Sequence, residues 1–218
     1  MCFSAAASFT AATATGIAGV VTATRVTTFR EAPLGSVPLI FAVQQAIEGG
    51  LWLVLGHQWP EALGPMLANS FVTIALVVWP LLAPVAILLV EMNSWRRAAI
   101  AALLLMGAVV AVYSASDIVQ HPYAAQAIGG SLCYVNKSPF PLSLFAAYAL
   151  ATCGPALISS RPVLRGFGVI VVTGGIVSLF FYFVAFLSVW CFFAAAASVV
   201  IGAHFVRGTR DVPVPVSF

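Results

Sequence analysis

Eight of the nine basic residues lie in four short segments between or after long apolar runs, and this placement constrains the fold more than any motif does. Seven apolar runs can be drawn around these segments so that all eight arginines lie on one side of a membrane and Lys137 lies on the other. An excess of Lys and Arg in cytoplasmic loops is the positive-inside pattern. The sequence therefore predicts an all-α, integral membrane seven-transmembrane-helix bundle with its N-terminus outside and its C-terminus in the cytoplasm. The pairs are Arg25 and Arg30, Arg96 and Arg97, Arg161 and Arg165, and Arg207 and Arg210.

Composition supports a membrane protein independently. The chain is 62% hydrophobic and 7% charged, with a mean hydropathy of +1.08, so a soluble globule could not be covered with polar surface. Seven spans of roughly 20 residues each fill most of the 218 residues. We therefore expect a single domain over residues 1–210 and an extended Val-Pro tail over residues 211–218. The net charge of +3 comes from the arginines beside the membrane, so no nucleic-acid partner is expected.

The apolar runs and the prolines beside them set the expected boundaries of the spans. The first run has no charged segment ahead of it and no cleavage site, so we interpret it as a retained helix and not as a signal peptide. The last apolar stretch, Val163–Val206, is too long for one helix and must turn back, around Phe186–Ser188. The first five expected helices are Ser4–Thr24, Leu34–Gly56, Leu67–Val90, Ala98–Ser116 and Phe140–Ile158.

The prolines of the third span and the longest connection give two further predictions. Pro80 and Pro84 lie inside the third span and predict a kinked helix, whose freed carbonyls are satisfied by neighbouring helices or water. The longest outer connection, Asp117–Ser138, is expected to be a loop that has a function or lies across the mouth of the bundle.

Glu48 is the one acidic residue that the expected topology places well inside the hydrocarbon region. Gln44, Glu48 and Trp52 recur every four residues, so they share one helix face, and Gln45 adjoins it. An intramembrane carboxylate is a candidate functional group, here in a polar pocket of helices one, two and seven that binds a small ligand through Gln44, Gln45, Glu48 and Trp52. The alternative is a protonated Glu48 that only fastens helices together. Glu91, beside Arg96 and Arg97, is explained by an interfacial ion pair.

The cysteines form a second constellation at the expected outer face. Cys2, Cys133 and Cys191 permit three disulfide pairings with one thiol left over, or packing without any link. They also permit a metal site, because two thiolates, a carboxylate and an imidazole suit zinc or copper. The predicted metal ligands are Cys2, Glu48, His121 and Cys191, with His57 as the alternative imidazole, whereas Cys153 is expected to be a core residue.

Several familiar chemistries are excluded by residue type. Retinal requires a lysine in the last helix, and the only lysine is Lys137 in a loop. A haem held by two histidines inside the bundle is unsupported, because all three histidines lie at or beyond span ends. No evident base partner is found for Ser4, Ser8, Ser178, Ser188 or Ser198, so no catalytic residues are assigned.

Four stretches of the chain carry a resemblance. They are Met1-Cys2-Phe3-Ser4-Ala5, the run from Phe41 to Gly49 with Trp52, the stretch from Trp79-Pro80 to Glu91, and Ser188-Val189-Trp190-Cys191-Phe192-Phe193-Ala194-Ala195. Together they resemble an uncharacterised family of small bacterial polytopic membrane proteins with no assigned activity. The resemblance implies a multi-pass protein of the bacterial inner membrane. Where that family has a histidine just ahead of the tyrosine matching Tyr134, this chain has Ser131-Leu132-Cys133.

Three classes of function follow. The first is a membrane protein that binds a metal ion or small ligand reached from outside, without an assigned enzymatic activity. The second is an accessory or structural subunit of a larger membrane complex, which small size and the absence of a soluble domain favour. The third is a transporter, against which the absence of a visible inverted repeat argues.

Overall fold

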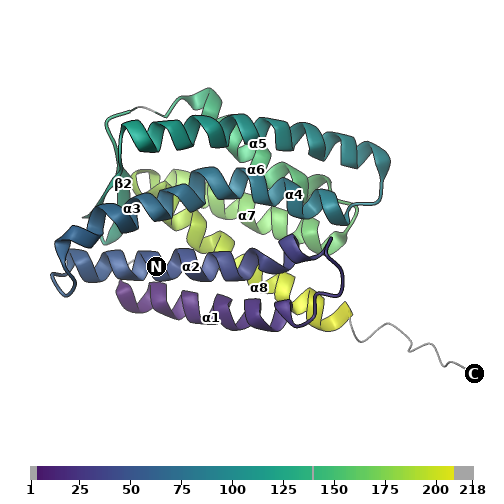
Figure 1. Cartoon of the computed structure of the whole chain (residues 1–218), viewed down its shortest axis with the longest axis horizontal. Coiled ribbons are helices and arrows are strands. Elements are labelled where there is room, and N and C mark those ends of the chain that lie inside the picture. Colours follow the sequence, from purple (N-terminus) through teal and green to yellow (C-terminus); the bar gives the residue numbers. More distant parts are fainter. Residues whose placement is uncertain (1–3, 139, 209–218) are drawn as a thin grey trace, which may run out of the picture.

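The computed structural model describes residues 4–138 and 140–208 and consists mainly of long helices packed side by side (Figure 1). The connections include 3₁₀ turns at Glu61–Leu63 and Phe183–Ala185 and a β-hairpin made of β1 (Ala124–Ile128) and β2 (Ser131–Val135). A π-helical segment, η2 (Ile74–Val78), joins the third helix to the fourth. The helices are α1 (Ala5–Ala23), α2 (Ala32–Leu55), α3 (Gly64–Thr73), α4 (Trp79–Val90), α5 (Ser94–Gln120), α6 (Leu142–Ile158), α7 (Pro162–Phe181) and α8 (Phe186–Gly208).

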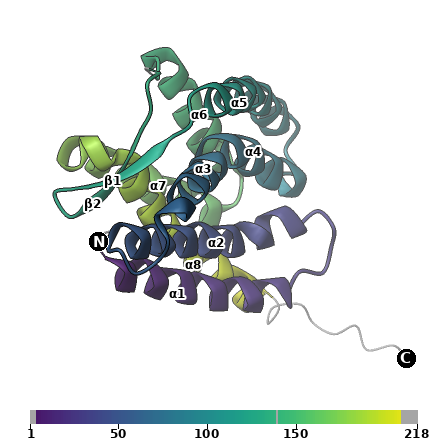
Figure 2. The same ribbon diagram turned by 60° about the vertical axis from the view of Figure 1, so that its left-hand side comes forward.

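The eight helices form seven rods, because α3, η2 and α4 continue one another, and this confirms the expected number of helices in the described part of the chain. Six of the rods are long and apolar enough to cross a membrane, and α6, with 17 residues, is shorter. Five elements form a closed ring in which α2 contacts α4, α4 contacts α6, α6 contacts α7, α7 contacts α8 and α8 contacts α2. Outside the ring, α1 packs on α2 and α8, and α5 packs on α4 and α6 (Figure 2).

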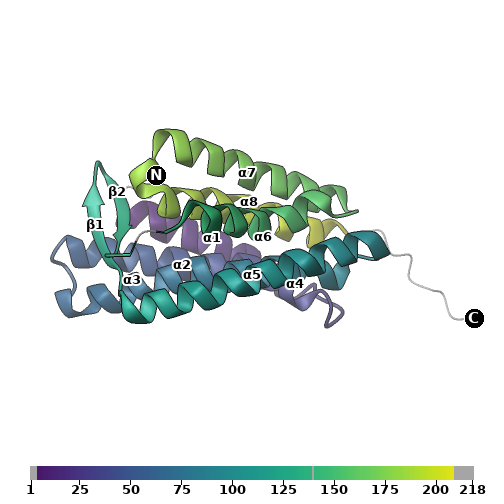
Figure 3. The same ribbon diagram turned by 90° about the horizontal axis from the view of Figure 1, so that it is seen from above.

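The two ends of the bundle differ in chemistry. The β-hairpin lies at one end, which we call the hairpin end, and the chain leaves α8 at the opposite end (Figure 3). The connections from α1 to α2, α4 to α5 and α6 to α7 lie at that opposite end, which we call the arginine end. The first three arginine pairs lie in these connections or in the first turns of the helices that follow them. Arg210 and the expected tail over residues 211–218 lie outside the described residues.

The connection between α5 and α6 differs from the predicted loop. Helix α5 continues to Gln120 instead of ending at Ser116, and an antiparallel hairpin follows, so the fold is not purely helical. Gly129 and Gly130 have φ angles of 58° and 76°, which a two-residue hairpin turn of the I′ type requires and which cost glycine little. Leu132 of β2 packs in a buried cluster with Leu51 of α2 and Ala68 of α3, so the hairpin closes over that end of the bundle.

The turn between the last two helices was also predicted in the wrong place. It spans residues 182–185, so Phe186–Ser188 forms the first turn of α8 and not the connection. Residues 176–201 contain neither Gly nor Pro, so no residue marks the break. The shift matters because it turns Ser188 into a helical residue one turn ahead of Cys191.

The predicted kink in the third span takes the form of the π-helical segment η2. In the i to i+5 pattern of a π-helix the carbonyl of Ala75 would accept from residue 80, but Pro80 has no N–H. The hydroxyl of Tyr148 on α6 donates to that carbonyl at 2.9 Å. A neighbouring helix therefore satisfies the freed carbonyl, as the prolines predicted.

We expect Tyr148→Phe to destabilise the protein by about 1–3 kcal/mol, because it leaves a buried carbonyl oxygen without a donor and otherwise preserves the ring. Thermal unfolding in detergent measures the loss. Tyr113→Phe, on the exposed face of α5, removes the same hydroxyl and is the matched control. Equal melting temperatures for the two variants would contradict this role of Tyr148.

Candidate functional site

The predicted stripe on α2 is buried where α2 meets α1 and α8. Gln44, Gln45 and Glu48 are fully buried at 0% exposure, and Trp52, one turn further, is half-buried. The seventh rod of the bundle is α8, so helices one, two and seven do meet at these residues. Small residues permit the close approach: Gly49 lies against the ring of Phe9 on α1, with no room for a side chain there.

Two sets of hydrogen bonds tie the stripe to its neighbours. The indole N–H of Trp79 on α4 donates to Gln44 Oε1 at 2.8 Å, and Gln44 Nε2 donates to the Cys191 sulfur on α8 at 3.3 Å. One helix turn away, the hydroxyl of Ser188 on α8 donates to Glu48 Oε1 in a short hydrogen bond. The carboxylate and the thiol predicted from the sequence therefore lie at neighbouring levels of one α2–α8 contact.

The helix register brings Ser8 to the same level. Phe9 packs on Gly49, and Thr22 lies near Gly202 of α8, so α1 runs antiparallel to α2 and parallel to α8. Counting back along these helices places Ser8 beside the turns that hold Glu48 and Ser188. We call this set the polar seam; it consists of Ser8, Gln44, Gln45, Glu48, Trp52, Ser188 and Cys191.

Part of the polar seam has no hydrogen-bond partner among the residues that the structure describes. Both polar atoms of the Gln45 amide, the Ser8 hydroxyl and the Trp52 indole N–H are buried without one. A buried polar group left unpaired costs about 1–3 kcal/mol, which is large beside the marginal stability of a folded chain. The seam therefore presents donors and an acceptor that a bound molecule of matching polarity can satisfy.

The structure brings together only part of the predicted metal set. Cys2 lies outside the described residues, and His121 pairs with Asp117 on α5. Over residues 4–138 and 140–208, no three His, Cys, Asp or Glu side chains lie close enough to hold one metal ion. Cys133, Cys153 and Cys191 are free thiols, so no disulfide joins Cys133 to Cys191 in this structure.

Cys133 and Cys153 are packed among buried apolar side chains. Cys133 lies in β2, buried against Ala185 and Val189, and burial raises the pKa of its thiol. Cys153 packs in the main apolar core, as expected from the sequence.

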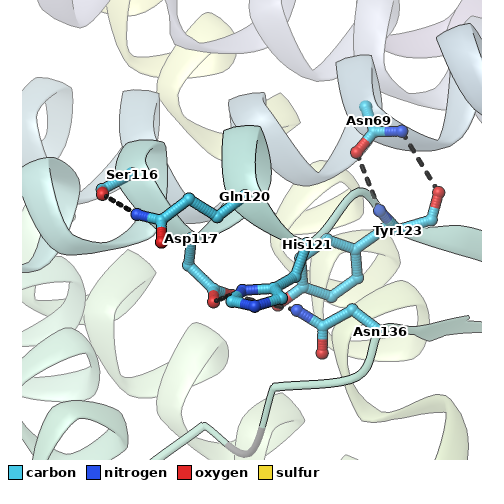
Figure 4. Close-up of polar contacts among 7 residues, drawn as sticks. All are labelled: Asn69, Ser116, Asp117, Gln120, His121, Tyr123 and Asn136. Carbon is cyan, nitrogen blue, oxygen red and sulfur yellow. Dashed lines mark hydrogen bonds and ion pairs between the residues drawn. The ribbon is translucent and has the colours of Figure 1, made fainter.

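His121 belongs to a separate polar cluster that anchors the β-hairpin (Figure 4). Its ring nitrogen lies 3.0 Å from Asp117 Oδ1, and Asn136, just after β2, donates to Asp117 Oδ2 at 2.9 Å. Asn69 of α3 exchanges two hydrogen bonds with the backbone of Tyr123. Burial, with the negative charge of Asp117 next, raises the pKa of Tyr123 to about 12. These contacts hold the hairpin to α3 and α5 and account for His121 without a metal.

The prediction that Glu91 forms an ion pair with Arg96 or Arg97 is wrong. The Glu91 carboxylate, fully buried just after α4, accepts from the backbone N–H groups of Met92, Asn93 and Ser160 and from the Ser159 hydroxyl. The arginines instead donate to backbone carbonyls, Arg96 to Ile158 and Arg97 to Leu88 and Glu91. Helix starts supply unpaired N–H groups and helix ends supply unpaired carbonyls, so each charge finds a partner in the backbone.

Ser188 and Trp79 are members of the hydrogen-bond network that sequence reasoning missed. The prediction that Ser188 has no base partner is wrong, because its hydroxyl donates to Glu48. Ser188 also lies three residues before Cys191, a spacing that puts both on one helix face. That spacing was the sequence signal for Ser188. No such signal marks Trp79, because its partner Gln44 lies 35 residues away on a neighbouring helix.

The protein is thus a mainly α-helical bundle with a buried polar seam, and its long apolar helices are compatible with a membrane protein. The model of a family of unknown function, DUF6629, matches residues 1–215, and the chain belongs to this family. The resemblance to an uncharacterised family is thereby confirmed. No curated protein and no solved structure matches the chain significantly.

Proposed function

We propose that the chain is an integral membrane protein that crosses the membrane seven times, with the hairpin end outside, and that its polar seam binds a small polar ligand. Six apolar helices of sufficient length support insertion, and a seventh, α6, spans with the help of its neighbours in the ring. The arginine pairs at the end opposite the hairpin support the orientation. The location in a bacterial inner membrane is part of the proposal and is supported only by the resemblance described above.

The orientation has a direct test. Single cysteines at Gln126 in β1 and at Met92 in the α4–α5 connection should react with a membrane-impermeant thiol reagent from opposite sides of intact cells. We expect Gln126→Cys to be labelled in intact cells and Met92→Cys only after the membrane is permeabilised. Labelling of both positions in intact cells, or the reverse order, would overturn the proposed topology.

The observation that carries ligand binding is the amide of Gln45. This side chain is at 0% exposure, and neither its donor nor its acceptor has a partner within residues 4–138 and 140–208. Ser8 adds a hydroxyl on the same contact, and Trp52, which packs on the cluster of Leu51, Ala68 and Leu132, adds an indole N–H one turn beyond Glu48. A small molecule with a donor and an acceptor on neighbouring atoms, such as a primary amide or a hydroxy acid, matches this set. A zinc or copper ion held by Cys2, Glu48 and Cys191 is the alternative occupant.

We expect Gln45→Leu to lose the bound ligand, because leucine has similar size but cannot hydrogen-bond. The loss of one or two hydrogen bonds should weaken binding about tenfold or more. Native mass spectrometry of protein released from lipid nanodiscs measures the retained mass, and elemental analysis of the same sample reports zinc or copper. Gln120→Leu, at an exposed position of α5 where the amide bonds only to Ser116, is the matched control.

A purely structural role of Gln45 predicts a different result. If Gln45 only fills space, Gln45→Leu removes an unpaired amide and should raise the free energy of unfolding by about 1–3 kcal/mol, with no change in bound mass. That outcome would defeat the binding proposal and leave an accessory subunit as the better interpretation. Binding accompanied by movement of the ligand across vesicle membranes would favour a transporter instead.

A further inference from the structure

A long apolar groove runs along the surface between α6 and α7, with α8 behind it. Its volume is about 270 Å³. The exposed fractions of Leu150 and Ile176 at its edges are 54% and 52%, so the groove faces the surroundings of the bundle and not its interior. From α6 the wall is formed by Phe145, Ala149, Cys153 and Leu157, which recur every four residues along one face.

A second space adjoins the groove at the hairpin end. This cleft, also of about 270 Å³, lies between β2, α6 and the turn that joins α7 to α8. Its lining is more polar, because Tyr123, Tyr134 and Asn136 take part in it. Asn136 is held by Asp117, so the polar wall is fixed in place by the cluster that anchors the hairpin.

Four aromatic side chains stand at the junction of these spaces. Phe145 and Phe186 line both the groove and the cleft, and Trp190 lines the groove and a cavity inside the helix ring. Their ring centroids are 5.3 Å apart for Phe145 and Phe186 and 5.1 Å apart for Phe186 and Trp190, while Tyr148 lies 5.6 Å from Trp190. The groove and the cleft therefore adjoin each other at the rings of Phe145 and Phe186.

Trp190 closes the way from the groove into the ring. Its indole N–H donates to the Val171 carbonyl at 2.8 Å, and the ring lies against Gly175 so closely that a side chain there would meet it at 3.0 Å. A molecule in the groove is thus directed along α6 and α7 and toward the cleft, not into the centre of the bundle.

We propose that this groove binds one acyl chain of a lipid from the leaflet at the hairpin end, with the polar part of the lipid in the adjoining cleft. The wall from Phe145 to Leu157 is about 18 Å long at 1.5 Å per residue and follows most of α6, so the groove offers an apolar path of that length to a chain that enters at the hairpin end. The apolar lining matches a hydrocarbon chain, and the tyrosine and asparagine groups lie at the end where a lipid has its polar atoms. The proposal rests on the proposed membrane insertion and is independent of ligand binding at the polar seam.

Photocrosslinking tests this site. The protein is reconstituted in vesicles of phosphatidylethanolamine and phosphatidylglycerol that contain a small fraction of phosphatidylcholine with a diazirine in the middle of one acyl chain. Mass spectrometry then locates the adducts after illumination. We expect at least threefold more adducts per exposed apolar residue on the groove face of α6 and α7 than on the exposed face of α5, which carries Leu105, Val109 and Val112.

A matched pair of variants sharpens the result. Ala149→Phe fills the groove from its α6 wall and should lower the groove adducts to the level of α5, whereas Ala102→Phe, on the exposed face of α5, should leave them unchanged. Equal labelling of groove and α5 in the native protein overturns the proposal, whether or not Ala149→Phe folds. Absence of adducts on α5 as well would instead mean that the protein is not inserted in the bilayer.

Discussion

Replacing Gly107 with alanine should lower the stability of the bundle by about 3 kcal/mol, since added volume in a packed contact costs roughly 1–3 kcal/mol and more against backbone. A Cβ atom at this position of α5 would lie 2.0 Å from the carbonyl oxygen of Pro80 and 2.9 Å from its carbonyl carbon. Neither atom belongs to a flexible side chain, so α4 and α5 must move apart. Helix propensity alone predicts the opposite sign, because alanine is favoured over glycine by about 1 kcal/mol inside a helix.

Gly166→Ala is the matched control for this change. It lies inside α7, and a Cβ atom there has nothing within 4 Å, so the same substitution should be neutral or stabilise by up to about 1 kcal/mol. Unfolding in a graded mixture of mild and denaturing detergent measures both variants. If Gly107→Ala were as stable as Gly166→Ala, the close approach of α4 and α5 at Pro80 would be wrong.

Glu91→Gln should lower the free energy of unfolding by a comparable amount, about 3 kcal/mol, through an effect at the arginine end. The change removes one acceptor oxygen and the charge from a buried network and leaves its donors unsatisfied. The carboxylate accepts four hydrogen bonds that join the end of α4 to the starts of α5 and α7. A glutamine amide keeps one oxygen, but its NH₂ group faces the Ser160 N–H and cannot accept from it. Glu61→Gln, at an exposed residue that pairs only with His57, is the control and should change little.

The same residue gives the bundle a pH dependence. Burial alone would raise the pKa of the Glu91 carboxyl, but hydrogen bonds from Ser160, Asn93 and Ser159 lower it to about 2. In the unfolded chain the value is about 4.3, so the charged form stabilises the folded state above that pH. This stability is lost as the pH falls from about 4 to about 2. We expect the unfolding free energy of the native protein to decline across this window and that of Glu91→Gln to decline less; parallel curves would exclude Glu91 as the source.

The helical part of the fold was largely predictable, because two physical rules act on every span. A span needs an apolar run of sufficient length, and arginines mark the connections at one end. A neighbouring helix was also predicted to satisfy a carbonyl freed by the prolines, and Tyr148 does so at Ala75. This was predictable because Pro80 lacks an N–H in any surroundings. The hairpin was missed even though Gly129 and Gly130 together are a known turn signal, because each strand has only five residues and lacks clear alternation.

The helices that meet at the candidate site were predicted, as helices one, two and seven, but the hydrogen-bond partners there were not. The four-residue spacing of Gln44, Glu48 and Trp52 specifies a shared face of α2, but no pattern in the sequence gives the register that sets Ser188 and Cys191 against it. That register depends on side-chain packing throughout the bundle. For Glu91 the error had another cause. Proximity in sequence to Arg96 and Arg97 suggested ion pairs, whereas the unpaired backbone groups at three helix ends lay closer in space.

The pairing of α2 with α8 also sets the order in which the protein can be completed during synthesis. Ser188 and Cys191 follow their partners Glu48 and Gln44 by 140 and 147 residues. At a ribosomal rate of about 5–20 residues per second, roughly ten seconds or more pass before the last helix leaves the ribosome. If the chain inserts in a membrane as proposed, its acidic second helix stays without this final neighbour throughout that interval. Only the arrival of the seventh rod allows the ring to close, so a chain that ends before Ser188 leaves Glu48 without the hydrogen bond from that hydroxyl.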